Sequence, residues 1–184
     1  MVRSLAFVLV AALTILVGCG PAAALHGTTL QTPRPAPPFT LEDQNGRPLT
    51  LESLRGHVVA VFFGFTHCTD VCPETFERLN RAAREVASAK PVVAMITVDP
   101  RRDSLTALRT FVLRHGGAGF ALTGSQRELR SAYRAYGIAI EPRQGDIGHT
   151  DTVFVIDSSG RLRELLDPQT PVNAIAADLR ALAT

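Results

Sequence analysis

The sequence predicts a single α/β domain built on a central mixed β-sheet flanked by helices. Three apolar runs have the length and composition of strands buried on both faces, namely HVVAVFF (57–63), PVVAMITV (91–98) and TDTVFVI (150–156). Segments with a helical spacing of apolar residues separate these runs, and such alternation is typical of parallel strands joined by helices. With 184 residues, 46% of them apolar, the chain is long enough for one domain with a complete core.

A β-hairpin is expected to precede the first buried strand. FTL (39–41) and LTL (49–51) flank DQNG (43–46), a sequence that strongly favours a turn. The folded domain is therefore expected to span 39–184, with this hairpin as an N-terminal extension of the fold.

Four helices are expected from apolar residues that recur on one face. Their expected ranges are 73–88, 104–116, 125–136 and 170–182. Ser104 and Ser125 are candidate N-caps, because a serine hydroxyl can accept a hydrogen bond from a free N–H group of the first turn. Before the last helix, a turn at 157–160 leads into 161–166, which has room to pair antiparallel with the preceding strand. The sheet is therefore expected to be parallel in the middle, with an antiparallel edge.

The N-terminus is typical of a targeting signal. Arg3 gives a positive start, and 5–17 is an apolar run of 13 residues, which suits a signal peptide, whereas a spanning helix needs about 20. The sequence LVGC ends at Cys19 and resembles the lipobox of bacterial lipoproteins. Residues 1–18 are therefore expected to be a lipoprotein-type signal peptide, and Cys19 is expected to carry lipid. The alternative is an uncleaved short anchor with an idle cysteine.

The segment 19–38 is expected to be a tether. Its prolines favour an extended, semi-rigid chain, and they stand at positions 33, 35, 37 and 38. A lipid on Cys19 would anchor the domain to a membrane on its extracytoplasmic side, the periplasmic side or cell envelope. Only Cys68 and Cys72 would then remain as thiols of the mature domain, in a compartment that favours their oxidation.

Charge is nearly balanced, with 19 basic and 17 acidic residues and a net charge of +2. No run of five or more like charges occurs. Phosphate binding requires a concentrated basic face, so no nucleic-acid partner is expected. We expect a monomer.

The segment GFTHCTDVCPETF (64–76) places two cysteines between the first buried strand and the first helix. This order of strand, cysteine loop and helix indicates a thioredoxin-like architecture. A proline disfavours helical backbone at the residue before it, so Pro73 is expected to leave Cys72 at the helix cap, with Cys68 in the loop above. The positive end of the helix dipole would favour thiolates there.

Three uses of this cysteine pair are open: a structural disulfide Cys68–Cys72, a redox couple or a soft metal site. Three residues separate the cysteines, whereas thioredoxin-type motifs have two. The wider loop can close into a disulfide or open around a metal, and two thiolates select Cu(I) or Zn over hard ions. A peroxiredoxin-like peroxidase is not favoured, because Phe65 stands three residues before Cys68 and no proline precedes that cysteine suitably.

A third ligand would favour the metal site, and the sequence offers histidines at positions 26, 57, 67, 115 and 149. His149 comes directly before the third buried strand, and in a thioredoxin-like sheet the loop entering that strand borders the cysteine loop. The competing interpretation is an ordinary solvated histidine. His67, next to Cys68, also remains a candidate. Together with the two cysteines, His149 would give a three-coordinate Cu(I) site that can be extended for Cu(II).

The chain resembles the Sco/SenC family of copper chaperones from Phe39 to about Leu182. The segments that carry the resemblance are FTLEDQNG (39–46), VVAVFFGFTHCTDVCPETF (58–76), ITVDPRRDS (96–104), LTGS (122–125) and HTDTVFVIDSSG (149–160).

The resemblance implies a thioredoxin-like fold and one copper ion held by Cys68, Cys72 and His149. It also implies delivery of copper to the dinuclear copper centre of cytochrome c oxidase subunit II, or reduction of the cysteines of that centre. Another copper protein could be the target instead. The alternative function is a thiol–disulfide oxidoreductase that acts on copper-protein cysteines without itself carrying copper, and only then would the protein be an enzyme.

The chain departs from the family pattern at two positions. Thr69 stands where the family usually has a proline, and Gly148 stands where an acidic residue often precedes the distal histidine. Asp99, Arg102 and Asp103 match the family. We interpret these three residues as forming a turn and capping the helix that follows, rather than as copper ligands.

Overall fold

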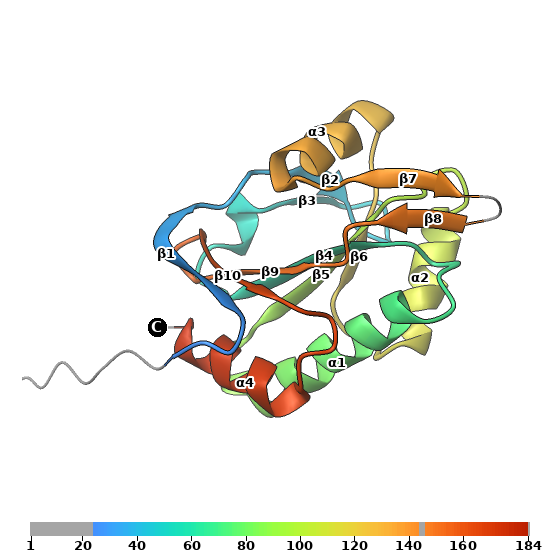
Figure 1. The fold of residues 1–184 in the computed structure, drawn as a ribbon. Helices are drawn as coiled ribbons and strands as arrows, with labels where there is room; N and C mark the ends of the chain where they lie inside the picture. Colours follow the sequence, from blue (N-terminus) through green and yellow to red (C-terminus); the bar gives the residue numbers. More distant parts are fainter. Residues whose placement is uncertain (1–23, 144–145, 184) are drawn as a thin grey trace, which may run out of the picture.

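A computed structural model describes residues 24–143 and 146–183, and it confirms the predicted α/β class. A six-stranded sheet has the order β1-β10-β9-β4-β5-β6, and two-stranded sheets β2-β3 and β7-β8 lie beside it (Figure 1). The strands are β1 Thr28–Pro35, β2 Thr40–Glu42, β3 Pro48–Thr50, β4 Val59–Gly64, β5 Val92–Thr97, β6 Phe120–Leu122, β7 Ile140–Arg143, β8 Asp146–His149, β9 Val153–Ile156 and β10 Arg161–Leu166. The helices are α1 Val71–Glu85, α2 Leu105–Arg114, α3 Gln126–Tyr136 and α4 Val172–Ala181, with short 3₁₀ turns at Glu52–Leu54 and Ala87–Ala89.

The large sheet is mixed, as the sequence predicted, but its parallel strands form one side rather than the middle, because β9 pairs antiparallel with β4. Strands β4, β5 and β6 run parallel, whereas β9, β10 and β1 continue the sheet through antiparallel pairs. The pairing of β4 with β5 runs from Val59 opposite Val92 to Gly64 opposite Thr97. Strand β6 was not predicted, because three residues are too few to show a strand period.

The core lies on both faces of β4, which explains its unbroken apolar sequence. Phe62 points toward α1, where its ring centroid lies 6.3 Å from that of Phe76. The next residue, Phe63, points to the other face and contacts Tyr136 of α3, with ring centroids 5.5 Å apart. Figure 1 shows α1 and α4 side by side under the sheet and α3 over it. Strand β4 is therefore held rigidly from both sides, and its carboxyl end leads into the cysteine loop.

Both predicted serine caps are confirmed. The Ser104 hydroxyl accepts a hydrogen bond from the backbone N–H of Ala107 at 3.2 Å. Ser125 forms a capping box in which its hydroxyl accepts from the Glu128 N–H, while the Glu128 carboxylate accepts from the Ser125 N–H at 2.8 Å.

Helix α1 differs from its prediction at the start. It begins at Val71, so Cys72 lies in the first turn rather than at the cap. Pro73 costs no hydrogen bond there, because the N–H groups of the first turn have no intrahelical partner. Two interactions outweigh the preference against helical backbone before proline: the Cys72 side chain is buried, and its backbone N–H donates to Cys68 Sγ at 3.4 Å.

The expected tether differs from the structure over 28–35. These residues form β1, which pairs antiparallel with β10 from Thr28 opposite Leu165 to Pro35 opposite Arg161. An edge strand tolerates proline, so the proline content that favoured a spacer is also compatible with this position. The folded domain therefore begins before Phe39. The predicted signal peptide 1–18 and Cys19 lie outside the described residues.

Two buried carboxylates form hydrogen bonds with residues 26 and 27, which lead into β1. The backbone N–H of Gly27 donates to Glu164 Oε1 at 2.5 Å, and His26 Nδ1 lies 2.8 Å from Asp178 Oδ1. The side chains of Glu164 and Asp178 are almost completely buried, and Glu164 Oε2 has no hydrogen-bond partner. Burial and the nearby Asp178 raise the pKa of Glu164 to about 7.

The expected hairpin at 39–51 is confirmed as β2 and β3, with Leu41 opposite Leu49. A second hairpin was not expected. The chain entering the third buried strand was expected to be a loop, but its segment EPRQGDIG (141–148) contributes to β7 and β8, which pair with Ile140 opposite His149. Proline and glycine within this segment concealed the strands. Among the described residues, no helix has the length and apolar character that crossing a membrane requires.

Candidate metal centre

The two cysteines and His149 meet at the carboxyl end of β4. Cys68 belongs to the loop after β4, Cys72 to the first turn of α1, and His149 to the last position of β8. Cys68 and His149 border a cleft of about 560 Å³, whereas Cys72 lies buried beside it. Its lining residues are Phe65, His67, Cys68, Thr69, Asp70, Val71, Ile147, Gly148, His149 and Asp151.

Cys72 is the side chain that joins the other two. Its Sγ lies 3.9 Å from His149 Nε2, and its backbone N–H contacts Cys68 Sγ. Cys72 is buried, whereas Cys68 is partly exposed, and both thiols are free. His149 therefore lies beside the cysteine loop, as its position before the third buried strand predicted, and Cys68 is the sulfur that an incoming molecule can reach.

A hydrogen bond of Nδ1 orients the imidazole ring of His149. Nδ1 lies 2.8 Å from the carbonyl oxygen of Thr150, which can only accept a hydrogen bond, so Nδ1 carries the proton. In the neutral ring Nε2 then keeps its lone pair, directed to the side of Cys72. The Phe65 ring packs edge-on against the imidazole, with centroids 5.8 Å apart at 82°. A backbone carbonyl thus provides the orienting partner that Gly148 cannot supply.

The electrostatics of the pair are asymmetric. The hydrogen bond from Cys72 is the main cause that lowers the pKa of Cys68 to about 5, and backbone N–H groups of Asp70 and Cys72 contribute. His149 contributes least among the causes of this shift. The pKa of Cys72 is raised, because its proton is held by the Cys68 sulfur and because the side chain is buried. At neutral pH Cys68 is therefore the thiolate and Cys72 the thiol.

Gly64, the last residue of β4, makes room for Cys72. A Cβ at this position would lie 3.1 Å from Cys72 Sγ and 3.2 Å from a ring carbon of Phe62. Any larger residue would push the buried sulfur or the Phe62 ring away by a few tenths of an ångström, so glycine favours their close packing against the strand. Sequence analysis did not single out this residue.

Asp103 stabilises the cysteine loop through hydrogen bonds to the backbone and side chain of Thr66. Its buried carboxylate accepts hydrogen bonds from the Thr66 N–H at 3.1 Å, the Thr66 hydroxyl at 2.6 Å and the Thr97 hydroxyl at 2.5 Å. The interpretation of Asp103 as a helix cap was therefore wrong, because Ser104 caps α2 and Asp103 ties β5 to the loop. This contact depends on the packing of separate segments, which a local sequence pattern does not reveal.

The turn expected at Asp99 is present, because its carbonyl accepts from the N–H groups of Arg102 and Asp103 at 3.1 and 2.9 Å. The Arg102 guanidinium pairs with the Asp99 carboxylate and lies over the Phe65 ring, 5.9 Å from its centroid.

The other histidines have different partners. His67 lines the cleft but turns its Nδ1 to the Thr66 hydroxyl at 3.1 Å. His26 pairs with Asp178, His57 lies 2.9 Å from the Lys90 carbonyl, and His115 lies 2.8 Å from Glu77. The contact with Cys72 therefore distinguishes His149 from the rest.

The donor set fits a soft metal, since it combines two sulfurs with one imidazole nitrogen. Within the described residues, no three side chains of His, Cys, Asp or Glu form a closed metal cage as they stand. Binding would therefore require a side-chain adjustment, and the partly exposed Cys68 is the residue placed to make it.

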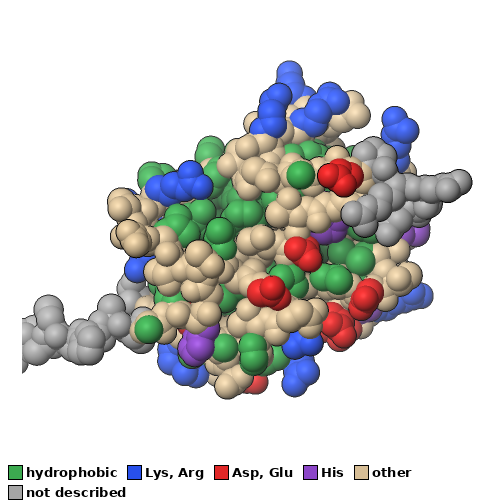
Figure 2. Space-filling model, in the orientation of Figure 1, with side chains coloured by type: hydrophobic (Ala, Val, Ile, Leu, Met, Phe, Trp, Pro, Cys, Tyr) green, Lys and Arg blue, Asp and Glu red, His purple; other side chains and the backbone are tan. Residues whose placement is uncertain are grey.

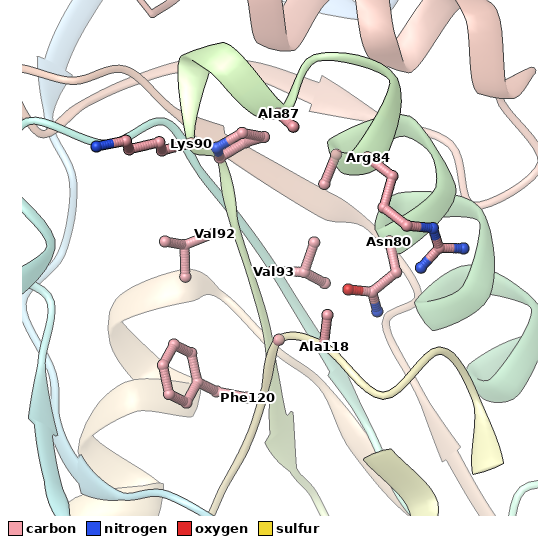
Figure 3. Close-up of a pocket in the computed structure, with 11 residues that line it drawn as sticks. Asn80, Arg84, Ala87, Lys90, Val92, Val93, Ala118 and Phe120 are labelled. Carbon is pink, nitrogen blue, oxygen red and sulfur yellow. The ribbon is translucent and has the colours of Figure 1, made fainter. Parts of the chain in front are cut away.

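A second cavity, of about 280 Å³, lies at the opposite end of the parallel strands (Figure 3). Asn80, Arg84, Lys90, Val93 and Phe120 are among its lining residues. No cysteine or histidine lines this cavity, so it offers no soft metal donor.

Comparison with known proteins places the chain in a family. The model of the SCO1/SenC family matches residues 27–184. This chain belongs to the SCO1/SenC family. The mouse relative, Protein SCO1 homolog, mitochondrial, is 30% identical over 154 residues, which cover 78% of this chain and 54% of the mouse protein. The chain thus matches only about half the length of that SCO1/SenC relative.

Solved structures of the SCO1/SenC family show the same fold. Apo Sco1 from Thermus thermophilus has a TM-score of 0.77 at 33% identity, covering 89% of this chain and 99% of that one. Bradyrhizobium japonicum ScoI with copper bound has a TM-score of 0.68 at 30% identity, covering 79% and 97%. The predicted thioredoxin-like fold and the predicted family are confirmed.

Proposed function

We propose that this protein is a copper metallochaperone that binds one copper ion through Cys68, Cys72 and His149. It would deliver the ion to the dinuclear copper centre of cytochrome c oxidase subunit II or to another copper protein. One observation carries the proposal: His149 Nε2 lies 3.9 Å from Cys72 Sγ, beside a cleft that His149 and Cys68 border.

The arrangement suits loading and release of a soft ion. Two sulfurs and one imidazole nitrogen match the preferences of Cu(I), and additional ligands can complete a Cu(II) site. Cys68 is partly exposed, so an acceptor's ligand can approach the ion at this sulfur while the buried Cys72 still holds it. The copper-bound Bradyrhizobium relative supports copper as the cargo. Zinc shares the preference for thiolates and is the competing metal.

Anaerobic titration of the reduced protein with Cu(I), against a competing chelator, tests the site. We expect one ion per chain, no stable complex with Cys68→Ser or Cys72→Ser, and weaker binding with His149→Ala. His115→Ala is the matched control, because that histidine pairs with Glu77 and should leave copper binding unchanged. A stoichiometry near zero for the wild-type protein would contradict the proposal.

The second candidate is a thiol–disulfide oxidoreductase, which the asymmetric pair favours. The Cys68 thiolate would attack a disulfide of a copper protein and form a mixed disulfide. Cys72, after losing its proton, would then displace the target's sulfur, leaving a Cys68–Cys72 disulfide and a reduced target. His149→Ala separates the two functions, because dithiol exchange does not need this ring. A variant without copper but with full biological activity would exclude the chaperone.

We also propose that the protein is lipid-anchored through Cys19 on the extracytoplasmic side of a membrane. The support is the sequence of 1–19, with its short apolar run and the lipobox-like LVGC. Metabolic labelling with a radioactive fatty acid should mark the wild-type protein and not Cys19→Ser. Equal labelling of the two would contradict the anchor.

A further inference from the structure

We propose that a groove beside the metal cleft is the docking surface for an acidic, partly apolar face of the copper-accepting protein. This inference rests on the proposed chaperone function and adds the chemistry of the partner. The groove has a volume of about 330 Å³ and lies between the turn after β5, helix α3 and the hairpin β7-β8. Its apolar lining includes Pro100, Tyr133, Ile140 and Ile147, and its rim carries Arg101 and Arg130.

The groove adjoins the metal cleft. Ile147 lines both hollows and lies two residues before His149 on β8. Across the hairpin, Ile140 pairs directly with His149. A protein that rests in the groove would therefore lie against the histidine side of the cleft, close enough to exchange an ion with it.

An excess of positive charge surrounds the groove. Arg101 and Arg130 are exposed, and Arg127 and Arg134 continue the row on the exposed face of α3. None of these four arginines forms an ion pair with another described residue. Figure 2 shows basic side chains gathered over α3. The surface therefore offers four guanidinium groups outside close ion pairs to an acidic partner.

Nearby carboxylates only partly offset this charge. The Asp99 carboxylate lines the groove but is paired with Arg102. Glu128 of α3, held by the capping box at Ser125, attracts Arg127 and leaves the other three arginines without an acidic partner among the described residues. The metal cleft has the opposite character, since Asp70 and Asp151 line it. A partner's acidic face would be attracted to the groove and repelled from the cleft wall, which fixes its orientation.

The apolar lining of the groove indicates that the partner also contributes an apolar side chain, in addition to its negative charge. Tyr133 and Ile140 are only partly covered, and the Tyr133 hydroxyl already donates to the Thr97 carbonyl at 2.6 Å. The tyrosine ring is therefore held in place and presents an apolar face without an unsatisfied hydroxyl. We expect the partner to place one apolar side chain here, with carboxylates around it, as in the apolar core and charged rim of many interfaces.

The test compares two double charge reversals of equal size. Arg101→Glu with Arg130→Glu changes the rim of the groove. Arg81→Glu with Arg84→Glu changes exposed α1 arginines, and Arg84 borders the distant cavity of Figure 3. The probe is the purified soluble copper domain of cytochrome c oxidase subunit II from the same organism. The measurement is the second-order rate of copper transfer from the loaded full-length protein.

We expect the groove variant to transfer copper at least about tenfold more slowly at low ionic strength, with the difference shrinking in high salt. The α1 variant should stay within about twofold of wild type. Copper stoichiometry is measured first: no binding by the wild-type protein refutes the chaperone function itself. Normal binding with equal transfer by all three proteins overturns the docking surface alone. Self-association of the wild type that the groove variant abolishes would assign the groove to a second copy of this chain, and would also overturn the proposal.

Discussion

Replacing Cys72 by alanine tests the electrostatic asymmetry of the cysteine pair. The hydrogen bond from Cys72 is the largest cause of the lowered pKa of Cys68, which lies at about 5 instead of 9.0. A thiol with a pKa of about 5 is about 99% ionised at pH 7, whereas one with a pKa of 9.0 is about 1% ionised. Cys72→Ala should therefore move the pKa of Cys68 upward by more than one unit. Backbone N–H groups remain and keep it below 9.0.

The assay is the ultraviolet absorbance of the thiolate as a function of pH, in metal-free, reduced and anaerobic protein. The pH dependence of alkylation by iodoacetamide provides an independent readout. Cys68→Ser should remove the titration near pH 5, which assigns it. His149→Ala should move the midpoint far less than Cys72→Ala, because the histidine is the weakest of the causes.

An unchanged midpoint in Cys72→Ala would refute this reasoning. It would mean that the N–H groups at the start of α1, rather than the neighbouring sulfur, stabilise the thiolate. A larger shift in His149→Ala than in Cys72→Ala would refute it as well, because the imidazole would then be the main partner of Cys68.

Three further changes test other parts of the molecule. Gly64→Ala would place a new Cβ 3.1 Å from Cys72 Sγ, so it should displace this sulfur and lower the affinity for Cu(I). In urea unfolding, the free energy of unfolding should fall by about 1–3 kcal/mol. Asp103→Ala leaves the polar hydrogens of Thr66 and Thr97 without their acceptor, so we expect about 2–4 kcal/mol of destabilisation and faster hydrogen exchange at the Thr66 amide; unchanged exchange would contradict the role of Asp103 as the loop anchor. Glu164→Gln removes a carboxyl whose pKa is raised from 4.5 to about 7. In the wild type, ionisation of this buried carboxyl lowers the free energy of unfolding as the pH rises through that window, by on the order of 2–3 kcal/mol at pH 8. The variant should flatten the fall in unfolding free energy between pH 5 and pH 8, and equal slopes for the two proteins would disprove the assignment.

The sequence predicted those parts of the fold that have a clear period and ordinary boundaries. The buried strands β4, β5 and β9 were visible as apolar runs, and Ser104 and Ser125 marked the helix starts. The strands that were missed lack such signals. β1 contains prolines, β6 has three residues, and the hairpin β7-β8 contains proline and glycine, so tertiary pairing decides their conformation.

The sequence predicted only those site residues whose role follows from their spacing in the sequence or from their place in the fold topology. The cysteines followed from their position after β4, and His149 followed from its position before β9. Gly64 and Asp103 could not be assigned in this way, because their roles depend on atoms brought close by folding. Asp103 did lie in a segment that resembles the Sco/SenC family, and this resemblance was the available signal for its importance.

The two prolines of β1 have a consequence for how the molecule behaves among its neighbours. The outermost strand of a sheet can recruit a strand from another molecule through its free N–H and carbonyl groups. Pro33 and Pro35 remove two of the donors from this strand, and its ladder with β10 is irregular between Thr29 and Arg34. At the opposite margin, β6 offers only three residues. Both margins of the large sheet are poor templates for intermolecular pairing, which disfavours the joining of this sheet between neighbouring copies.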